Sequence, residues 1–206
     1  MAHFVLPNSG HNYDPESSKL GMWLFLFTEI LLFGGLFIVY FVYRTINSDA
    51  FLRASYELNI TMGTINTIIL ITSSMTVAMA ITALQKGKEK FAINLLWITL
   101  LFAIAFLINK YFEWSIKIEH GIFPGMEHYN GLETGQKLYF FLYYFMTGLH
   151  ALHIIVGAIF IGFVIKGIQE GNVTADRISL LENSGLYWHL VDLIWIYLFP
   201  LFYLIN

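Results

Sequence analysis

The chain has 206 residues, of which 57% are hydrophobic and only 12% charged, and its mean hydropathy is +0.65. A chain this apolar is expected to lie largely within a lipid bilayer rather than to form an ordinary soluble domain. The net charge of -3 argues against nucleic-acid binding, and the absence of cysteine excludes disulfides, thiolate metal sites, iron-sulfur clusters and covalent c-type haem attachment.

Five long apolar stretches predict five transmembrane helices, since a helix needs about 20 apolar residues to cross about 30 Å of hydrocarbon. The predicted spans run from about 20 to 43, 60 to 84, 91 to 112, 138 to 165 and 185 to 205. They lack the short alternating segments of a membrane barrel, so the predicted fold class is all-α. Residues 1–19 are interpreted as a polar cytoplasmic tail, and residues 20–206 as a transmembrane domain with an outer loop at about 113–137.

The distribution of lysine and arginine predicts the orientation, because positive charges beside the spans tend to stay cytoplasmic. The turn QKGKEK at residues 85–90 packs three lysines between two spans. The loop from Lys110 to Lys137 instead offsets its lysines with four glutamates. We therefore expect the N-terminus inside and the C-terminus outside.

Five ionisable side chains stand out within the predicted spans, where each is a functional hypothesis because charge is unfavourable in hydrocarbon. Glu29 lies about ten residues into the first span, His150 and His153 lie in the fourth, and His189 and Asp192 lie in the fifth. Residues three apart share one helix face, so each of the two pairs is able to point into the bundle.

Three interpretations of these residues remain open. The first is a metal or haem site, although no helix carries a HExxH, Glu-xx-His or 2-His-1-carboxylate pattern. The second is interhelical hydrogen bonding that fixes packing. The third is a proton-linked or lipid-headgroup role, favoured for Glu29, with lipid contacts assigned to Glu29, His153, Trp188 and His189. The sequence predicts no catalytic residue and no metal ligand.

Strings in the last two spans resemble those of a known family. The fourth span contains TGLHALHIIVG, from Thr147 to Gly157, and the fifth contains YWHLVDLIWIYLF, from Tyr187 to Phe199. They are similar to the signature helices TG-x-H-G-x-H-x-x-x-G and W-H-F-V-D-x-x-W of the haem-copper respiratory oxidase subunit III family, which includes cytochrome c oxidase subunit III. The strings GMWLFLFTEILLFGGLF, INTIILITSSMT and YFEW extend the resemblance over nearly all of residues 20–205, and the first of them places Glu29 on the family's membrane carboxylate.

The sequence departs from the family pattern in three respects. The long form of the family has seven spans, whereas this chain has room for five and so resembles the short bacterial form. Thr28 stands where the family usually has Ser, and Ala151 where it usually has Gly. Histidines that follow the second span in many relatives are missing here.

The resemblance implies a non-redox subunit III of a proton-pumping haem-copper terminal oxidase, multi-pass in a bacterial inner membrane. Haem and copper then lie in partner subunits that reduce oxygen to water, so this chain is expected to bind no cofactor except phospholipid. The implied partners are oxidase subunit I by direct contact, subunit II, other oxidase subunits and membrane lipids, with a respiratory supercomplex left open. The implied roles are support of the catalytic subunit, lipid binding and sustained proton uptake.

Several alternatives remain open. The equivalent subunit of a quinol oxidase and the accessory protein of nitric oxide reductase systems share the same helices. A small transporter is disfavoured, because no inverted repeat is visible and Pro200 is the only proline within a span. A stand-alone haem-binding cytochrome would be recognised by a Soret band in the purified chain.

Overall fold

The structure, a computed structural model, describes residues 15–205, and within them every regular element is a helix. This confirms the predicted all-α fold. In chain order the helices are α1 (Pro15–Ile46), α2 (Ser48–Ser55), α3 (Ile60–Gln85), α4 (Glu89–Glu119), α5 (Glu127–Gly131), α6 (Thr134–Gln169) and α7 (Ser179–Tyr203). Of the polar tail predicted at residues 1–19, residues 1–14 lie outside the described part, and the backbone of 15–19 begins α1.

Five helices, α1, α3, α4, α6 and α7, are long and apolar enough to cross a membrane, as predicted. Each contains an 18-residue stretch whose mean hydropathy lies between 1.4 and 2.5. Helix α4 continues seven residues beyond the expected end of its span at Phe112, through Glu113 and Lys117. Its 31 residues give a length of about 46 Å, more than the hydrocarbon thickness of about 30 Å.

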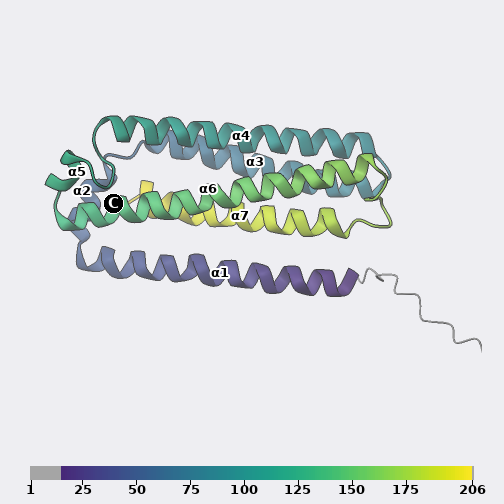
Figure 1. Ribbon diagram of the computed structural model, residues 1–206, viewed down its shortest axis with the longest axis horizontal. Coiled ribbons are helices and arrows are strands. Elements are labelled where there is room, and N and C mark those ends of the chain that lie inside the picture. The colour runs from purple at the N-terminus through teal and green to yellow at the C-terminus, as the bar shows by residue number, and fades with distance from the viewer. Residues whose placement is uncertain (1–14, 206) are drawn as a thin grey trace, which may run out of the picture.

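The five long helices run alternately up and down (Figure 1). Helices α3, α4, α6 and α7 form a four-helix bundle in which α3 contacts α4 and α7, and α6 contacts α4 and α7. Helix α1 packs outside this bundle, along α6 and α7. In the most apolar 18-residue stretch of α7, 61% of the residues are buried, against 17% in that of α1, so α7 is the central helix.

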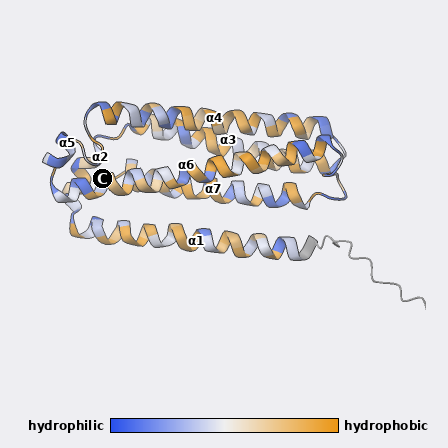
Figure 2. Ribbon diagram, viewed as in Figure 1, coloured by the Kyte–Doolittle hydropathy of each residue, from blue (hydrophilic) through white to orange (hydrophobic). Residues whose placement is uncertain are grey.

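The two ends of the bundle differ in what they carry. The start of α1, the turn at 86–88 and the loop at 170–178 share one end, and α2, α5 and the end of α7 share the other (Figure 1). Hydrophilic residues gather near these ends, while the middle of each long helix is mostly hydrophobic (Figure 2). This pattern is the one expected of a bundle that spans hydrocarbon between two aqueous surfaces.

Two buried tyrosines bind the last turn of α7. Backbone carbonyl groups at a helix C-terminus lack partners within the helix and must find them elsewhere. The hydroxyl of Tyr40, on α1, donates to the carbonyl of Leu201, and the hydroxyl of Tyr139, on α6, donates to that of Phe202 at 2.7 Å. Helix α1 is thereby tied to the bundle at this end.

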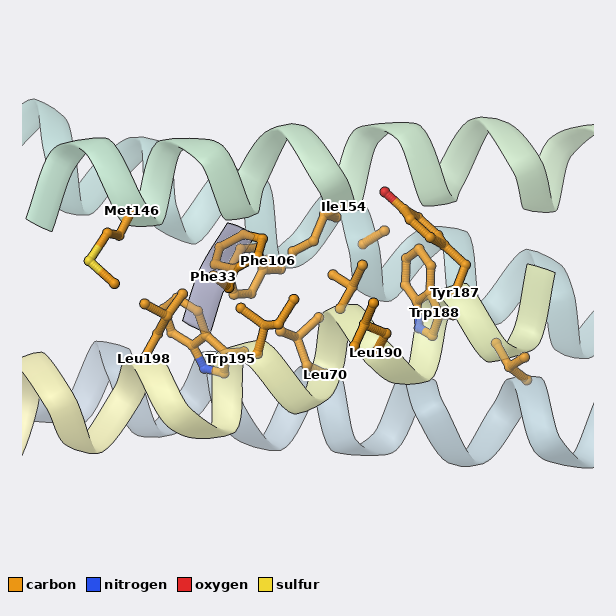
Figure 3. Packing of buried hydrophobic residues seen from close by; sticks show 14 of the residues in the cluster. Phe33, Leu70, Phe106, Met146, Ile154, Tyr187, Trp188, Leu190, Trp195 and Leu198 are labelled. Atoms are coloured by element: carbon orange, nitrogen blue, oxygen red, sulfur yellow. The ribbon is translucent and has the colours of Figure 1, made fainter. Parts of the chain in front are cut away.

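Aromatic side chains of α7 fill the core between α3 and α6 (Figure 3). Trp188 and Trp195 are both fully buried, and the Trp188 indole donates to the Ser73 hydroxyl at 3.1 Å. Close packing of Trp188 on α6 depends on Gly157, because a Cβ atom there would lie 2.9 Å from the indole ring. A glycine at this position lets the two helices approach closely enough to exclude lipid.

Candidate functional site

Glu29 of α1 and His153 of α6 form a pair across the helix interface. The Nε2 atom of His153 lies 2.8 Å from Oε2 of Glu29, and the two side chains are 12% and 14% exposed. Nδ1 of His153 lies 2.7 Å from the carbonyl oxygen of Leu149, so Nδ1 carries a proton and donates it. Nε2 then either accepts from a protonated carboxyl or donates to a carboxylate.

Aromatic rings hold this imidazole in place. The edge of Phe33, also on α1, meets the His153 ring with 5.2 Å between ring centroids, and Tyr187 of α7 stacks on it at 6.5 Å. The Tyr187 hydroxyl donates to the backbone carbonyl of His153 at 3.1 Å. Three helices therefore fix the position of the pair, which lies at the boundary between α1 and the bundle.

His150 does not join this pair, although it lies three residues away on the same helix. Its side chain is fully buried between Phe106 of α4 and Trp195 of α7, with ring centroids 5.6 Å and 5.3 Å away. Neither ring nitrogen has a hydrogen-bond partner within residues 15–205. The two histidines therefore lie in different environments: His150 in the core of the bundle and His153 at the interface with α1.

His189 and Asp192 of α7 come together with Ser74 of α3. The Ser74 hydroxyl lies 2.6 Å from Nδ1 of His189. Asp192 is 4% exposed, and the Ser74 hydroxyl is also the side chain that interacts with its carboxyl. All three side chains line one open cavity of about 370 Å³ between α3 and α7. Trp188, one of the residues assigned to lipid contact, lies behind this surface in the core.

The five ionisable residues thus occupy three separate places: a pair at α1 and α6, a caged imidazole in the core, and a groove between α3 and α7. Within residues 15–205, no three His, Cys, Asp or Glu side chains lie together in a group that could hold a metal ion. A metal or haem site would need several ligands converging on one point. The side chains instead make hydrogen bonds and ring contacts within the protein.

A buried ionic cluster at the end of α4 was missed by the sequence reasoning. Nζ of Lys110 lies 3.0 Å from Oε2 of Glu113 and donates to the hydroxyls of Tyr143 (3.1 Å) and Tyr203 (2.6 Å). Both hydroxyls also donate to Oε1 of Glu113, at 2.8 Å and 2.6 Å. All four side chains are buried, and the cluster joins α4, α6 and α7.

The sequence did contain a signal for this cluster. Lys110, Glu113 and Lys117 are spaced i, i+3, i+7 and so lie on one helix face, yet they were interpreted as charges of the outer loop. Lys117 is buried too, and its Nζ donates to the backbone carbonyl of Glu57 at 2.7 Å. Helix α4 is able to continue through these three charged residues because each of their side chains has a polar partner inside the protein.

Comparison with known proteins places this chain in one family. The family model described as cytochrome c oxidase subunit III matches residues 11–206. A cytochrome c oxidase subunit 3 from Thermostichus vulcanus is 31% identical over 193 residues, covering 93% of this chain and 89% of that protein. A quinol oxidase subunit 3 from Bacillus subtilis is 27% identical and covers 97% and 94%.

A third relative is much longer. The haem-copper oxidase subunit I+III from Aeropyrum pernix is 31% identical over 199 residues. The match covers 94% of this chain but only 23% of that fused protein.

Proposed function

Because this chain belongs to the cytochrome c oxidase subunit III family and is a subunit III of a haem-copper oxidase, we propose that it acts there without a redox centre of its own. Its proposed roles are to support the catalytic subunit and to sustain proton uptake. The observation that carries this proposal is the separation of the histidines. His153 bonds Glu29, His189 bonds Ser74, and His150 is enclosed by aromatic rings.

The Glu29–His153 pair is the proposed proton-linked element. The two side chains lie within hydrogen-bond distance, so a proton shared between them would move between oxygen and nitrogen without placing an isolated charge in hydrocarbon. The pair also joins α1 to α6. Gain or loss of a proton by Glu29 or His153 would therefore change how α1 packs against the bundle.

The test is a variant of the intact oxidase. Glu29→Ala is expected to leave the haem content of the purified complex unchanged while it alters proton uptake or the number of turnovers before inactivation. Haem absorbance and oxygen-pulse proton uptake are measured on the same preparation. Loss of the haem bands in this variant would show that Glu29 supports a redox centre, contrary to the proposal.

We further propose direct contact with oxidase subunit I, and assembly with subunit II and the other oxidase subunits. The fused Aeropyrum pernix relative supports the first contact, since there a subunit I is joined to a subunit III in one polypeptide. Phospholipid contact is proposed for the partly exposed Glu29, His153 and His189. Membership of a respiratory supercomplex is part of the same proposal. Affinity purification in mild detergent, followed by mass spectrometry of proteins and lipids, tests these assignments.

The proposed orientation in a bacterial inner membrane places the N-terminus in the cytoplasm. The end that carries the start of α1 has Lys19, Lys86, Lys88, Lys90, Lys166 and Arg177. The opposite end has five basic residues in sequence, but Lys110 and Lys117 are buried, which leaves Arg44, Arg53 and Lys137. Six basic residues at one end against three exposed ones at the other support the positive-inside assignment. The sequence alone, with six against five, supports it less well.

A quinol oxidase is the second candidate complex, favoured by the match to the Bacillus subtilis protein over 97% of this chain. Cytochrome c oxidase is favoured by the higher identity of the Thermostichus vulcanus protein. Oxygen consumption by the native complex with reduced cytochrome c, and separately with a quinol, distinguishes the two electron donors.

A further inference from the structure

We propose that a phospholipid with a phosphoethanolamine headgroup binds in a cavity between the start of α1 and the start of α7, with one acyl chain along the groove between α3 and α7. The inference rests on the phospholipid contact proposed above and deepens it, because it names the headgroup and the residues that bind it. Three observations carry it: a buried amide oxygen without a partner, an ion pair beside it, and an apolar groove that continues from the cavity.

The side-chain amide of Asn183 has an unbonded oxygen. Asn183 is 7% exposed and lines a cavity of about 310 Å³. Its Nδ2 donates to Oγ of Ser18 at 3.0 Å, but its Oδ1 has no hydrogen-bond partner in the described part of the chain. Buried amide oxygens are normally bonded, since an unbonded one loses its hydration without compensation. The cavity is therefore suited to a ligand that carries a hydrogen-bond donor.

An ion pair lines the same cavity. Nζ of Lys19 lies 3.0 Å from Oε2 of Glu182, and the two side chains are 51% and 27% exposed, so both remain accessible to a ligand. The ammonium is able to bond a phosphate oxygen, and the carboxylate is able to bond a cation. Because the pair provides one positive and one negative group, it is complementary to a headgroup that carries one charge of each sign.

Phosphoethanolamine provides both charges and the donor. Its phosphate fits Lys19, and its primary ammonium has three N–H groups, enough to bond both the Glu182 carboxylate and Oδ1 of Asn183. A choline headgroup is also zwitterionic, but its quaternary nitrogen has no N–H to donate. A phosphoglycerol headgroup has hydroxyl donors but no cation for Glu182. The three residues therefore favour ethanolamine over both of these headgroups.

The cavity lies at the depth of a lipid headgroup. Lys19 is the fifth residue of α1 and Asn183 the fifth of α7, so each lies about 6 Å from the start of its helix. Trp23, one turn further along α1, lines the same cavity and is 59% exposed. Tryptophan is enriched at the membrane interface, where headgroups meet acyl chains. The polar end of the cavity thus lies on the headgroup side of this level.

An apolar groove leads from the cavity toward the middle of the membrane. His189 lines both the cavity and the groove of about 370 Å³ between α3 and α7. From Asn183 to Ile196, α7 rises about 20 Å, more than half of the hydrocarbon thickness of about 30 Å. One acyl chain is therefore able to follow the groove within its own leaflet. The apolar residues that line the groove are Ile71, Met75, Ala78, Leu193 and Ile196.

Competition between defined lipids tests the headgroup assignment. The intact oxidase is purified through a tag on this chain, stripped of lipid with detergent, and incubated with equal amounts of dioleoyl-phosphatidylethanolamine, dioleoyl-phosphatidylcholine and dioleoyl-phosphatidylglycerol. Native mass spectrometry measures the lipids that remain bound. Phosphatidylethanolamine is expected to be retained about tenfold over phosphatidylcholine, because choline loses hydrogen bonds to both acceptors. Equal retention of the three lipids overturns the assignment.

Two substitutions locate the site. Asn183→Leu removes the acceptor and Lys19→Ala removes the phosphate partner, and each is expected to lower the retained phosphatidylethanolamine about threefold to tenfold. Lys19 is half-exposed, so its substitution tests the site even where Asn183→Leu does not fold. The matched control is Lys90→Ala, an exposed lysine at the same end of the bundle that does not line the cavity, and it is expected to retain the lipid fully. An equal loss in Lys19→Ala and Lys90→Ala would mean that surface charge alone retains the lipid, contrary to the proposal.

A photoreactive acyl chain tests the groove. In the detergent-solubilised complex, phosphatidylethanolamine with a diazirine in one acyl chain is expected to give adducts at Met75, Leu193 or Ile196. Ile159, which is 51% exposed on α6, is the matched position where none is expected. Adducts at Ile159 alone overturn the groove assignment. Soluble phosphoethanolamine at the same concentration is expected to leave the lipid bound, and displacement of the lipid by it would identify a free small molecule as the ligand, against the proposal.

The same preparation separates this inference from the proposed function. If haem co-purifies with the tagged chain but phosphatidylethanolamine is not preferred, only the headgroup assignment fails. If the tagged chain brings down no haem-bearing subunit, the proposed function fails, and a preference of the chain alone for phosphatidylethanolamine still supports the lipid site.

Discussion

Glu29 and His153, 124 positions apart in the sequence, bond each other at 2.8 Å across the interface between α1 and α6. Helix α1 is the least buried of the five spans. This polar contact and the hydrogen bond of Tyr40, near the C-terminal end of α1, therefore help to hold α1 against the bundle. Two ionisable side chains therefore stand at the attachment point of a peripheral helix.

Removing one member of this pair should weaken the attachment of α1. In His153→Leu the Glu29 carboxyl loses its partner, which destabilises the protein by about 1–3 kcal/mol because a nearly buried polar group is left unbonded. The double variant Glu29→Leu/His153→Leu should be less destabilised than the sum of the two single variants. Thermal denaturation in detergent measures all four proteins. Strict additivity would mean that the two residues are not coupled.

The ionic cluster of α4 should behave as a unit. Glu113→Leu leaves the Lys110 ammonium buried without its carboxylate, and the expected loss of stability is about 3–5 kcal/mol. Adding Lys110→Met to this variant should recover much of that loss, because no unpaired charge then remains in the core. The midpoint of unfolding in detergent is the measurement, and failure of the second substitution to rescue the first contradicts the ion-pair account.

Two glycines of α6, one in close contact with α7 and one in open space, allow a controlled test of helix packing. Gly157→Ala places a Cβ atom 2.9 Å from the Trp188 ring and 3.1 Å from that of Tyr187, so it should destabilise the bundle by about 1–3 kcal/mol. Gly162→Ala meets nothing within 4 Å and should be neutral or slightly stabilising, since alanine favours helix more than glycine does. If both variants unfold at the same temperature, close contact at Gly157 is not what positions α7.

The absence of cysteine makes the orientation directly measurable. In Lys88→Cys the thiol should be protected from a membrane-impermeant maleimide added to spheroplasts, and in Glu127→Cys it should be labelled. Both side chains are exposed, so accessibility from the aqueous phase decides the result. Labelling of position 88 alone would reverse the assigned orientation.

The fold was largely predictable because hydropathy is a local property. A run of about 20 apolar residues must cross the bilayer as a helix whatever its neighbours are, since its backbone has no other hydrogen-bond partners in lipid. The five spans, the helical fold and the family resemblance in the last two spans therefore follow from the order of residues alone. The predicted end of the third span at Phe112 was too early, because a charge was assumed to mark the membrane surface.

Only the tertiary structure decided which polar side chains meet. Spacing placed His150 and His153 on one face of α6, but the rotation of that helix between α1, α4 and α7 sends one imidazole to Glu29 and the other into an aromatic cage. The same holds for Lys110 and Glu113, whose burial depends on the hydroxyls of Tyr143 and Tyr203 from two other helices. Whether a charge lies in water or in a core depends on partners that are distant in the sequence, and a single span contains no information about them.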